Sequence, residues 1–223
     1  MNDIQDAWDR IANVIYAESP EEANKAYTKW ADKFDTDINS TLCCVSNEEL
    51  AENSLIHIKN NESAQLLDLA AGTGLAAEAL LDHGYKGVMD GVELNEDMLK
   101  KAESKGIYRK HICFKITPGA SIPVGQNIYD TVICSGALGA NHLEEGCIVR
   151  MIHCLKPGGI LVFNTRKTEA NKVFVLKLDA MMKELVDIGQ LSKIEVKEVL
   201  QFRSNCNETG DAMMAWLYIY KKL

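Results

Sequence analysis

The stretch AQLLDLAAGTG at residues 64–74, followed at once by LAAEALL at residues 75–81, decides the fold. Its first seven residues form a short apolar run that is typical of a buried strand, and LAAEALL favours a helix. Gly72 and Gly74 lie between them and can adopt backbone conformations that other residues avoid. The stretch therefore predicts a strand, a glycine turn and a helix in direct succession.

The alternation of strand and helix continues outward from this stretch towards the C-terminus. Further strands are predicted at residues 87–94, 111–117, 130–135 and 160–164. Helices are predicted between and after them, at residues 96–105, 143–155 and 171–188. Asn95 can cap the first of these helices, and residues 156–159 (KPGG) predict a turn before the last strand. Strands that alternate with helices predict a parallel sheet with helices on both faces.

The first 60 residues are predicted to be helical. Ser19 with Glu22, and Ser46 with Glu49, both match the capping box that opens a helix. Aromatic residues then recur at helical spacing after the first of these boxes. We therefore expect a helical cap, or lid, ahead of the first strand.

Two strand segments, at residues 193–202 and 212–220, close the chain. The loop between them, residues 203–210, is polar and too short for a crossover helix, so the two strands predict an antiparallel hairpin. The sequence thus predicts an α/β fold: a Rossmann-like, doubly wound, seven-stranded sheet, mostly parallel with one antiparallel edge strand. We expect one compact domain, with the helical cap at residues 1–60 and the core at residues 61–223.

The composition is that of an acidic globular protein. The 223 residues include 24 Lys and Arg against 32 Asp and Glu, a net charge of −8, and 47% of them are hydrophobic. These values exclude disorder for the bulk of the chain. The acidic balance also disfavours a nucleic-acid partner, because phosphate binding needs a concentrated basic face.

Neither a membrane nor a metal site is indicated by the sequence. No apolar run approaches the ~18 residues that span a bilayer, and the N-terminus lacks the apolar segment of a secretory signal. The five histidines are scattered, and none of the seven cysteines forms a C-x-x-C pair. We therefore expect reduced cysteines, a cytoplasmic location, no membrane partner and no metal, while the sequence leaves the oligomeric state open.

A cofactor site is predicted where the first two strands end, because ligands of a doubly wound sheet bind beyond the carboxyl ends of its strands. The first strand ends at the glycine turn, whose helix supplies free backbone N–H groups. The second ends at Glu93, which follows Gly74 by 93 − 74 = 19 residues, the spacing of one helix and one strand. A carboxylate there can accept hydrogen bonds from both hydroxyls of a ribose, so we expect an adenosine-containing cofactor.

Two cofactors of this kind are compatible with the glycine turn. GTGLAA at residues 72–77 matches the dinucleotide fingerprint G-x-G-x-x-G/A, with Ala77 at its last position. Asp68 favours S-adenosylmethionine instead, because its charge would repel a pyrophosphate but attract an amino group and a sulfonium. A buried acid is costly on its own, so Asp68 needs a cationic or hydrogen-bond-donating partner. The alternative is an acid that only stabilises the end of the strand.

Four segments, in order, resemble the motifs of class I S-adenosylmethionine-dependent methyltransferases. They are LLDLAAGTG at residues 66–74, GVELNEDML at 91–99, DTVI at 130–133 and LKPGG at 155–159. The resemblance extends over residues 26–220. It implies a Rossmann-like methyltransferase core that binds S-adenosylmethionine.

A further segment gives a finer resemblance. AYTKWADKFD at residues 26–35, together with Thr165 and Arg166, resembles the methyltransferase-like family from the Williams–Beuren syndrome chromosome region. Thr28 and Phe34 stand where that family has an aspartate and a tyrosine. These two differences remove polar groups from the predicted lid.

The resemblance implies a set of cofactor-binding residues. Asp68 would face the amino group of the cofactor and Glu93 its ribose. Tyr27 and Trp30 would form a lid, unless they only pack on the core, and the same alternative applies to Met98 beside the adenine. The complete set is Tyr27, Trp30, Asp68, Ala70, Gly72, Thr73, Gly74, Glu93, Leu94, Met98, Gly119 and Ser135.

The resemblance also implies a direct attack on the methyl group, for which alignment matters more than a strong base. His142 and Asn141 after the fourth strand are the candidates for catalysis, Asn164 is a candidate orienting group, and Arg166 could hold an acidic substrate. The predicted function is S-adenosylmethionine-dependent methyl transfer to an unidentified small molecule or protein. The alternatives are an NAD-dependent oxidoreductase and a non-catalytic module that keeps the cofactor pocket.

Overall fold

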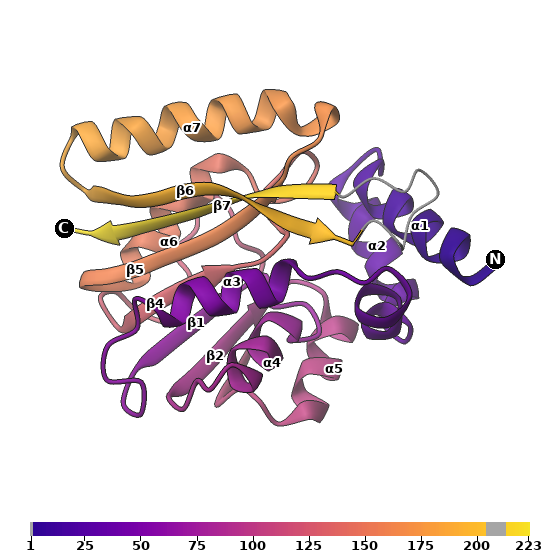
Figure 1. Cartoon of the computed structure of the whole chain (residues 1–223), viewed down its shortest axis with the longest axis horizontal. Helices are drawn as coiled ribbons and strands as arrows, with labels where there is room; N and C mark the ends of the chain where they lie inside the picture. The colour runs from indigo at the N-terminus through magenta and orange to yellow at the C-terminus, as the bar shows by residue number, and fades with distance from the viewer. Residues whose placement is uncertain (1, 204–212) are drawn as a thin grey trace.

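The computed structural model describes residues 2–203 and 213–223. At its centre lies a seven-stranded sheet in the order β3-β2-β1-β4-β5-β7-β6 (Figure 1). The strands are β1 (Gln65–Leu69), β2 (Val88–Glu93), β3 (Lys110–Cys113), β4 (Tyr129–Cys134), β5 (Leu155–Arg166), β6 (Leu191–Phe202) and β7 (Met213–Lys222). Neighbouring strands among β1 to β5 pair in parallel, as predicted.

The α/β class and the mostly parallel seven-stranded sheet are confirmed, with one correction at the edge. β7 pairs antiparallel with both β5 and β6, so the antiparallel strand lies one place inside the edge and β6 forms the edge. β7 carries the buried run LYIY, whereas β6 carries the charged run KIEVKE. Charged side chains protect an edge strand against pairing with other chains. Apart from Arg203, the loop predicted at residues 203–210 lies outside the described residues.

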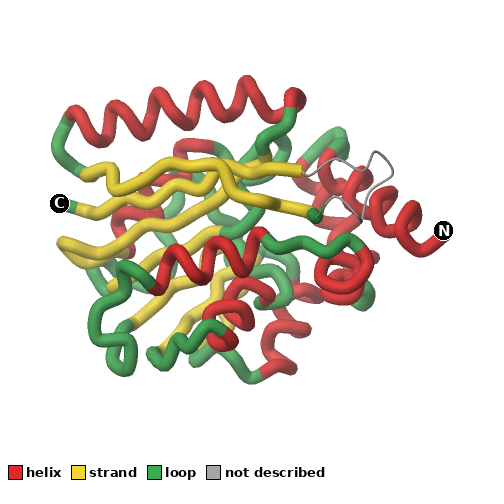
Figure 2. Tube along the Cα trace, viewed as in Figure 1, coloured by secondary structure: helices red, strands yellow, loops and turns green. Residues whose placement is uncertain are grey.

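Helices cover both faces of the sheet, as Figure 1 and Figure 2 show. Residues Leu66 and Leu67 of β1 belong to two different apolar cores, one on each face. Burial on both faces explains why the parallel strands read as continuous apolar runs. The helices on the first face are α3 (Ser46–Leu55), α4 (Leu75–Asp82) and α5 (Glu96–Lys105), and those on the second are α6 (Ile148–Cys154) and α7 (Lys172–Asp187).

The first part of the chain forms a helical layer at one end of the sheet (Figure 1). Asp37 holds this layer together: Arg10 donates to its carboxylate through Nε at 2.5 Å and Nη2 at 3.0 Å, and the Trp30 indole donates at 2.6 Å. α3 does not belong to the layer, because it packs beside α4 on the sheet. The layer consists of α1 (Asn2–Ile15), α2 (Pro20–Trp30) and the π-helix η1 (Thr36–Thr41).

Two details of the predicted helix starts are wrong. Ser19 caps α2 by accepting the Glu22 N–H at 3.2 Å, as predicted, but the Glu22 carboxylate accepts the N–H of Glu18 rather than that of Ser19. Ser46 lies in the first turn of α3, whose N-cap is Val45. The capping-box pattern therefore located both helices to within one residue without giving their hydrogen bonds.

The turn predicted at residues 156–159 is also wrong, because these residues belong to β5. Leu155 pairs with Tyr129 of β4, and the register then shifts before Thr131 pairs with Ile160. A bulge of this kind lets a strand continue through residues that would otherwise end it.

Five of the six cysteines within the described residues are free thiols. Cys43 is disulfide-bonded, which contradicts the expectation that all cysteines are reduced. Cys113 is free and exposed, and the buried free thiols are Cys44, Cys134, Cys147 and Cys154. Within residues 2–203 and 213–223, no group of three or more His, Cys, Asp or Glu is arranged to hold a metal ion. No helix in the described part of the chain has the length and apolar character of a membrane span.

A buried carboxylate on β2 anchors the start of β3. Asp90 accepts hydrogen bonds from Arg109 Nε at 2.9 Å, from Arg109 Nη2 at 2.5 Å and from the Tyr129 hydroxyl at 2.7 Å. We expect Asp90→Asn to lower the free energy of unfolding by about 2 kcal/mol, because the amide nitrogen of the variant would face one of these donors. Urea denaturation measures the change.

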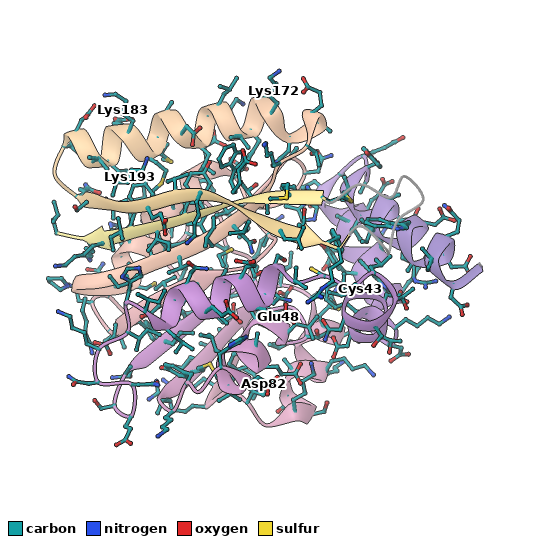
Figure 3. All side chains as sticks on the ribbon, viewed as in Figure 1. Cys43, Glu48, Asp82, Lys172, Lys183 and Lys193 are labelled. Carbon is teal, nitrogen blue, oxygen red and sulfur yellow. The ribbon has the colours of Figure 1, made fainter. Side chains whose placement is uncertain are left out.

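The matched control is Asp82→Asn at the exposed end of α4 (Figure 3). We expect this variant to change the free energy of unfolding by less than about 0.5 kcal/mol. Equal losses in the two variants would contradict a specific role for the Asp90 hydrogen bonds.

Candidate active site

A cavity of about 840 Å³ opens where β1, β2, β4 and β5 end, beside the helical layer. Its volume falls within the usual range for ligand sites, roughly 300–1,000 Å³. Of the predicted cofactor-binding residues, Gly74 and Gly119 do not line this cavity. The others do, namely Tyr27, Trp30, Asp68, Ala70, Gly72, Thr73, Glu93, Leu94, Met98 and Ser135. The fold thus brings them together, while their roles toward a cofactor stay predictions.

The turn after β1 is built from left-handed backbone conformations. The φ angle is 56° at Ala70, 56° at Gly72 and 89° at Gly74. Gly74 is the N-cap of α4, and its N–H donates to the Ala71 carbonyl at 2.9 Å. Gly74 therefore shapes the turn without facing the cavity. Ala70 has a side chain at a positive φ, a strained conformation that is found preferentially at functional sites.

Glu93, at the end of β2, holds the glycine turn against the neighbouring strand. Its Oε2 accepts the Gly72 N–H at 2.8 Å and its Oε1 accepts the Asn95 N–H at 2.8 Å. Burial raises the pKa of Glu93, against the lowering effect of these backbone donors. Each carboxylate oxygen keeps a second lone pair. Glu93 can therefore still accept hydrogen bonds from two ribose hydroxyls.

Asp68, at the end of β1, is 1% exposed and lines the cavity. The Tyr108 hydroxyl donates to its Oδ2 at 2.6 Å, so the donor that we expected for Asp68 is a tyrosine that the sequence analysis missed. Burial raises the pKa of Asp68 to about 7, although the Tyr108 hydrogen bond lowers it, and the charge of Glu93 adds to the rise. The sequence held one signal for this contact: Gly91 is a glycine within a strand, and such a glycine can mark a place where another group packs closely. In the structure a Cβ at Gly91 would lie 2.9 Å from the Tyr108 ring.

Polar side chains of the helical layer are bonded directly to the site. The Asn95 amide caps α5 with its oxygen and donates with its nitrogen to the Asn24 carbonyl at 2.9 Å and to Thr28 Oγ1 at 2.9 Å. Thr73 in the glycine turn donates to Asp35 Oδ1 at 2.5 Å. Thr28 thus supplies a polar contact of the helical layer, where we expected it to remove one. Asn24 and Asp35 were missed by the sequence analysis.

Three aromatic rings of this layer border the cavity. The rings of Tyr27 and Trp30 lie nearly parallel, with centroids 6.2 Å apart, and Phe34 packs edge-on against Trp30 at 4.6 Å. Trp30 is only 3% exposed and its indole is bonded to Asp37. Trp30 therefore packs in the core of the helical layer as well as lining the cavity.

His142 and Tyr27 both line the cavity and contact each other there. The Tyr27 hydroxyl lies 3.0 Å from His142 Nε2, and His142 Nδ1 lies 3.2 Å from the Ala140 carbonyl. The carbonyl can only accept, so Nδ1 carries the proton and Nε2 accepts from the tyrosine. Burial, and then the charge of Arg166, lower the pKa of His142 to about 4. Burial raises the pKa of Tyr27 to about 12. Both side chains are therefore neutral near pH 7.

The side chains of Asn141 and Asn164, the other candidate and the candidate orienting group, are hydrogen-bonded to backbone groups of this chain. The Asn141 amide donates to the Ile15 carbonyl at 3.3 Å, which joins the loop after β4 to α1. Asn164 is 1% exposed, lies outside the cavity lining and accepts the Gly136 N–H at 2.6 Å. Asn164 therefore positions the loop after β4 rather than facing a ligand.

Three similarities to known proteins agree with this geometry. Residues 66–159 match a family described as a methyltransferase domain. Methyltransferase-like protein 27 of Homo sapiens is 30% identical over 167 residues, which cover 73% of this chain and 65% of that protein. Demethylmenaquinone methyltransferase of Desulfitobacterium hafniense (strain Y51) is 30% identical over 102 residues, which cover 44% of this chain and 40% of that protein. The chain thus spans less than two thirds of the length of these curated relatives.

The whole fold is shared with proteins of much lower sequence identity. The crystal structure of the [4+2]-cyclase SpnF superposes with a TM-score of 0.69 at 14% identity, covering 92% of this chain and 97% of the cyclase. Likeness at this identity establishes the fold but not the reaction. Residues 66–159, which hold β1 to β4 and the start of β5, thus match a methyltransferase domain, and the whole sheet has a Rossmann-like fold.

Proposed function

We propose that this chain transfers the methyl group of S-adenosylmethionine to a small molecule or a protein. The observation that carries the proposal is the position of two carboxylates at one cavity, Asp68 at the tip of β1 and Glu93 at the tip of β2. The amino group of the cofactor suits Asp68, and its ribose hydroxyls suit Glu93. The methyltransferase domain at residues 66–159 supports the same reading.

S-adenosylmethionine supplies a methyl group that is activated by its sulfonium. In the transfer, a lone pair of the acceptor forms a bond to the methyl carbon while the bond from that carbon to sulfur breaks. The electron pair passes to sulfur and leaves S-adenosylhomocysteine, and an acceptor atom that carries a proton releases it. Residues of this chain bind both partners, align them and exclude water, which supplies roughly 7–11 kcal/mol in the best intramolecular cases.

Two alternative functions remain to be separated from methyl transfer. An NAD-dependent oxidoreductase fits less well, because Asp68 faces the cavity where a pyrophosphate would have to lie. A non-catalytic module finds support in His142, whose Nε2 is occupied by the Tyr27 hydroxyl and whose low pKa makes it a poor base.

Calorimetric titration with S-adenosylmethionine, S-adenosylhomocysteine and NAD tests the cofactor. We expect both sulfur compounds to bind and NAD to give no heat of binding. Binding of NAD without binding of S-adenosylmethionine would overturn the proposal. A homocysteine-release assay against metabolite and peptide libraries then tests the reaction, and binding without turnover on any acceptor would favour the non-catalytic module.

The finer kinship with the methyltransferase-like family from the Williams–Beuren syndrome chromosome region is part of the proposal. Tyr27 and Trp30, which carry that resemblance, both line the cavity. Our expectations of a cytoplasmic location, and of partners other than nucleic acid or a membrane, stay predictions.

A further inference from the structure

We propose that the methyl acceptor carries a carboxylate and that Arg166 binds this group. The inference rests on the proposed methyl transfer and names the substrate class. Arg166 is the last residue of β5 and lines the same cavity as Asp68 and Glu93. Asp68 and Glu93, the carboxylates that we propose bind the cofactor, lie at the tips of β1 and β2. β5 lies two strands away from β1 and brings the Arg166 cation to the same end of the sheet.

Arg166 has no carboxylate partner among the described residues. Burial lowers the pKa of Arg166, against the raising effect of the hydroxyls of Tyr27 and Tyr16. Two other arginines of the chain do have a carboxylate partner. Arg10 donates two hydrogen bonds to the Asp37 carboxylate, and Arg109 donates two to the Asp90 carboxylate. A half-buried guanidinium without a counter-ion costs free energy, which an anionic ligand would recover.

None of the described groups around Arg166 neutralises it. A Cβ at Gly139 would lie 3.2 Å from Arg166 Nη2, so the guanidinium packs against the loop after β4. That loop carries His142, which is neutral and bonded to Tyr27. Lys115 also lines the cavity, but its Nζ lies 3.5 Å from Glu21 Oε1, so this cation already has a carboxylate partner.

One unpaired guanidinium matches one carboxylate. The planar fork of arginine fits the two oxygens of a carboxylate, and its single charge balances a monoanion but not a phosphate dianion. α1 lines the cavity with Ile11 and Ile15, and the Ile15 carbonyl is bonded to the loop that carries His142. We therefore expect an acid with an apolar body.

The test uses hexanoate, hexan-1-ol and inorganic phosphate as probes, each titrated by calorimetry into the full chain saturated with S-adenosylhomocysteine. We expect hexanoate to bind about tenfold more tightly than hexan-1-ol and than phosphate. Arg166→Met should abolish the preference for hexanoate. Arg166→Lys should keep part of it, because lysine retains the charge but not the fork.

Thermal denaturation of the ligand-free protein gives a second readout. We expect Arg166→Met to raise the melting temperature by about 2 °C, because it removes a half-buried charge that has no counter-ion among the described residues, whereas a purely structural arginine would lower it on removal. The matched control is Lys167→Met, whose lysine is the next residue and pairs with Glu198 at 2.6 Å. This control should leave the preference for hexanoate unchanged.

The outcomes separate the two proposals. If S-adenosylhomocysteine does not bind, the proposed methyl transfer fails, and titration of hexanoate into the ligand-free chain still decides whether Arg166 binds carboxylates. If S-adenosylhomocysteine binds but hexanoate and hexan-1-ol bind equally, the acceptor inference is overturned. Tighter binding of phosphate than of hexanoate, or a preference for hexanoate that survives Arg166→Met, overturns it as well.

Discussion

Glu93→Gln is expected to lower the affinity for S-adenosylmethionine by about 100-fold, since hydrogen bonds to a charged acceptor contribute roughly 1.5–3 kcal/mol. The Glu93 carboxylate accepts the N–H groups of Gly72 and Asn95 at 2.8 Å each and has lone pairs left for the ribose. In the variant, an NH₂ group would face one of these backbone donors, so the glycine turn would also lose its support. Calorimetric titration measures the affinity.

The control for this variant is Glu96→Gln in the first turn of α5. Glu96 is exposed and lies only three residues away. We expect Glu96→Gln to change the affinity for S-adenosylmethionine by less than about twofold, because an exposed charged side chain contributes little to binding. If Glu93→Gln is folded and binds as tightly as the unchanged chain, the assignment of the ribose to Glu93 is wrong.

Asp68→Asn should weaken binding of S-adenosylmethionine by about 100-fold at pH 8, the loss expected when a buried charge pair is broken. The pKa of Asp68 is raised to about 7 in the folded chain, so the carboxyl is largely neutral at pH 6 and largely ionised at pH 8. A cation binds the ionised form, and the affinity of the unchanged chain should therefore rise about tenfold from pH 6 to pH 8. Titrations at pH 6, 7 and 8 measure both effects.

The same pKa has a consequence for stability. A carboxyl whose pKa is raised by folding binds its proton more tightly in the folded chain than in the unfolded one, where the pKa is 3.8. Its contribution is therefore fully present below pH 3.8 and is lost as the pH rises towards about 7. Asp68→Asn should accordingly gain stability relative to the unchanged chain between pH 5 and pH 8.

Asp97→Asn is the control for the Asp68 predictions, because Asp97 pairs with Lys100 at the surface. This variant should keep the rise of affinity with pH. A rise that persists unchanged in Asp68→Asn would show that another group controls binding.

Much of the fold and part of the site could be predicted, because these features depend on residues that lie close together in the sequence. The glycine turn needs positive φ at Gly72 and Gly74, and glycine is the residue that tolerates it. The Asn95 cap depends on side-chain and N–H groups only two or three residues apart. The spacing from Gly74 to Glu93 equals one helix and one strand, so both ends had to meet at one edge of a parallel sheet.

The errors arose where local patterns are compatible with more than one arrangement. A hairpin can join a sheet through either of its strands, and the apolar faces of β7 decided that it lies between β5 and β6. The KPGG segment is a turn by local preference, but pairing of β5 with β4 extends the strand through it.

The sequence by itself determined which backbone turns, helix starts and strand tips this chain has, because those depend on neighbouring residues. Only the tertiary structure decided which distant side chains complete the site. Tyr108 reaches Asp68 from 40 residues away, and Tyr27 reaches His142 across 115 residues. Such contacts depend on the register of the strands and on the packing of the helical layer, since a shift of one residue would turn each side chain to the opposite face.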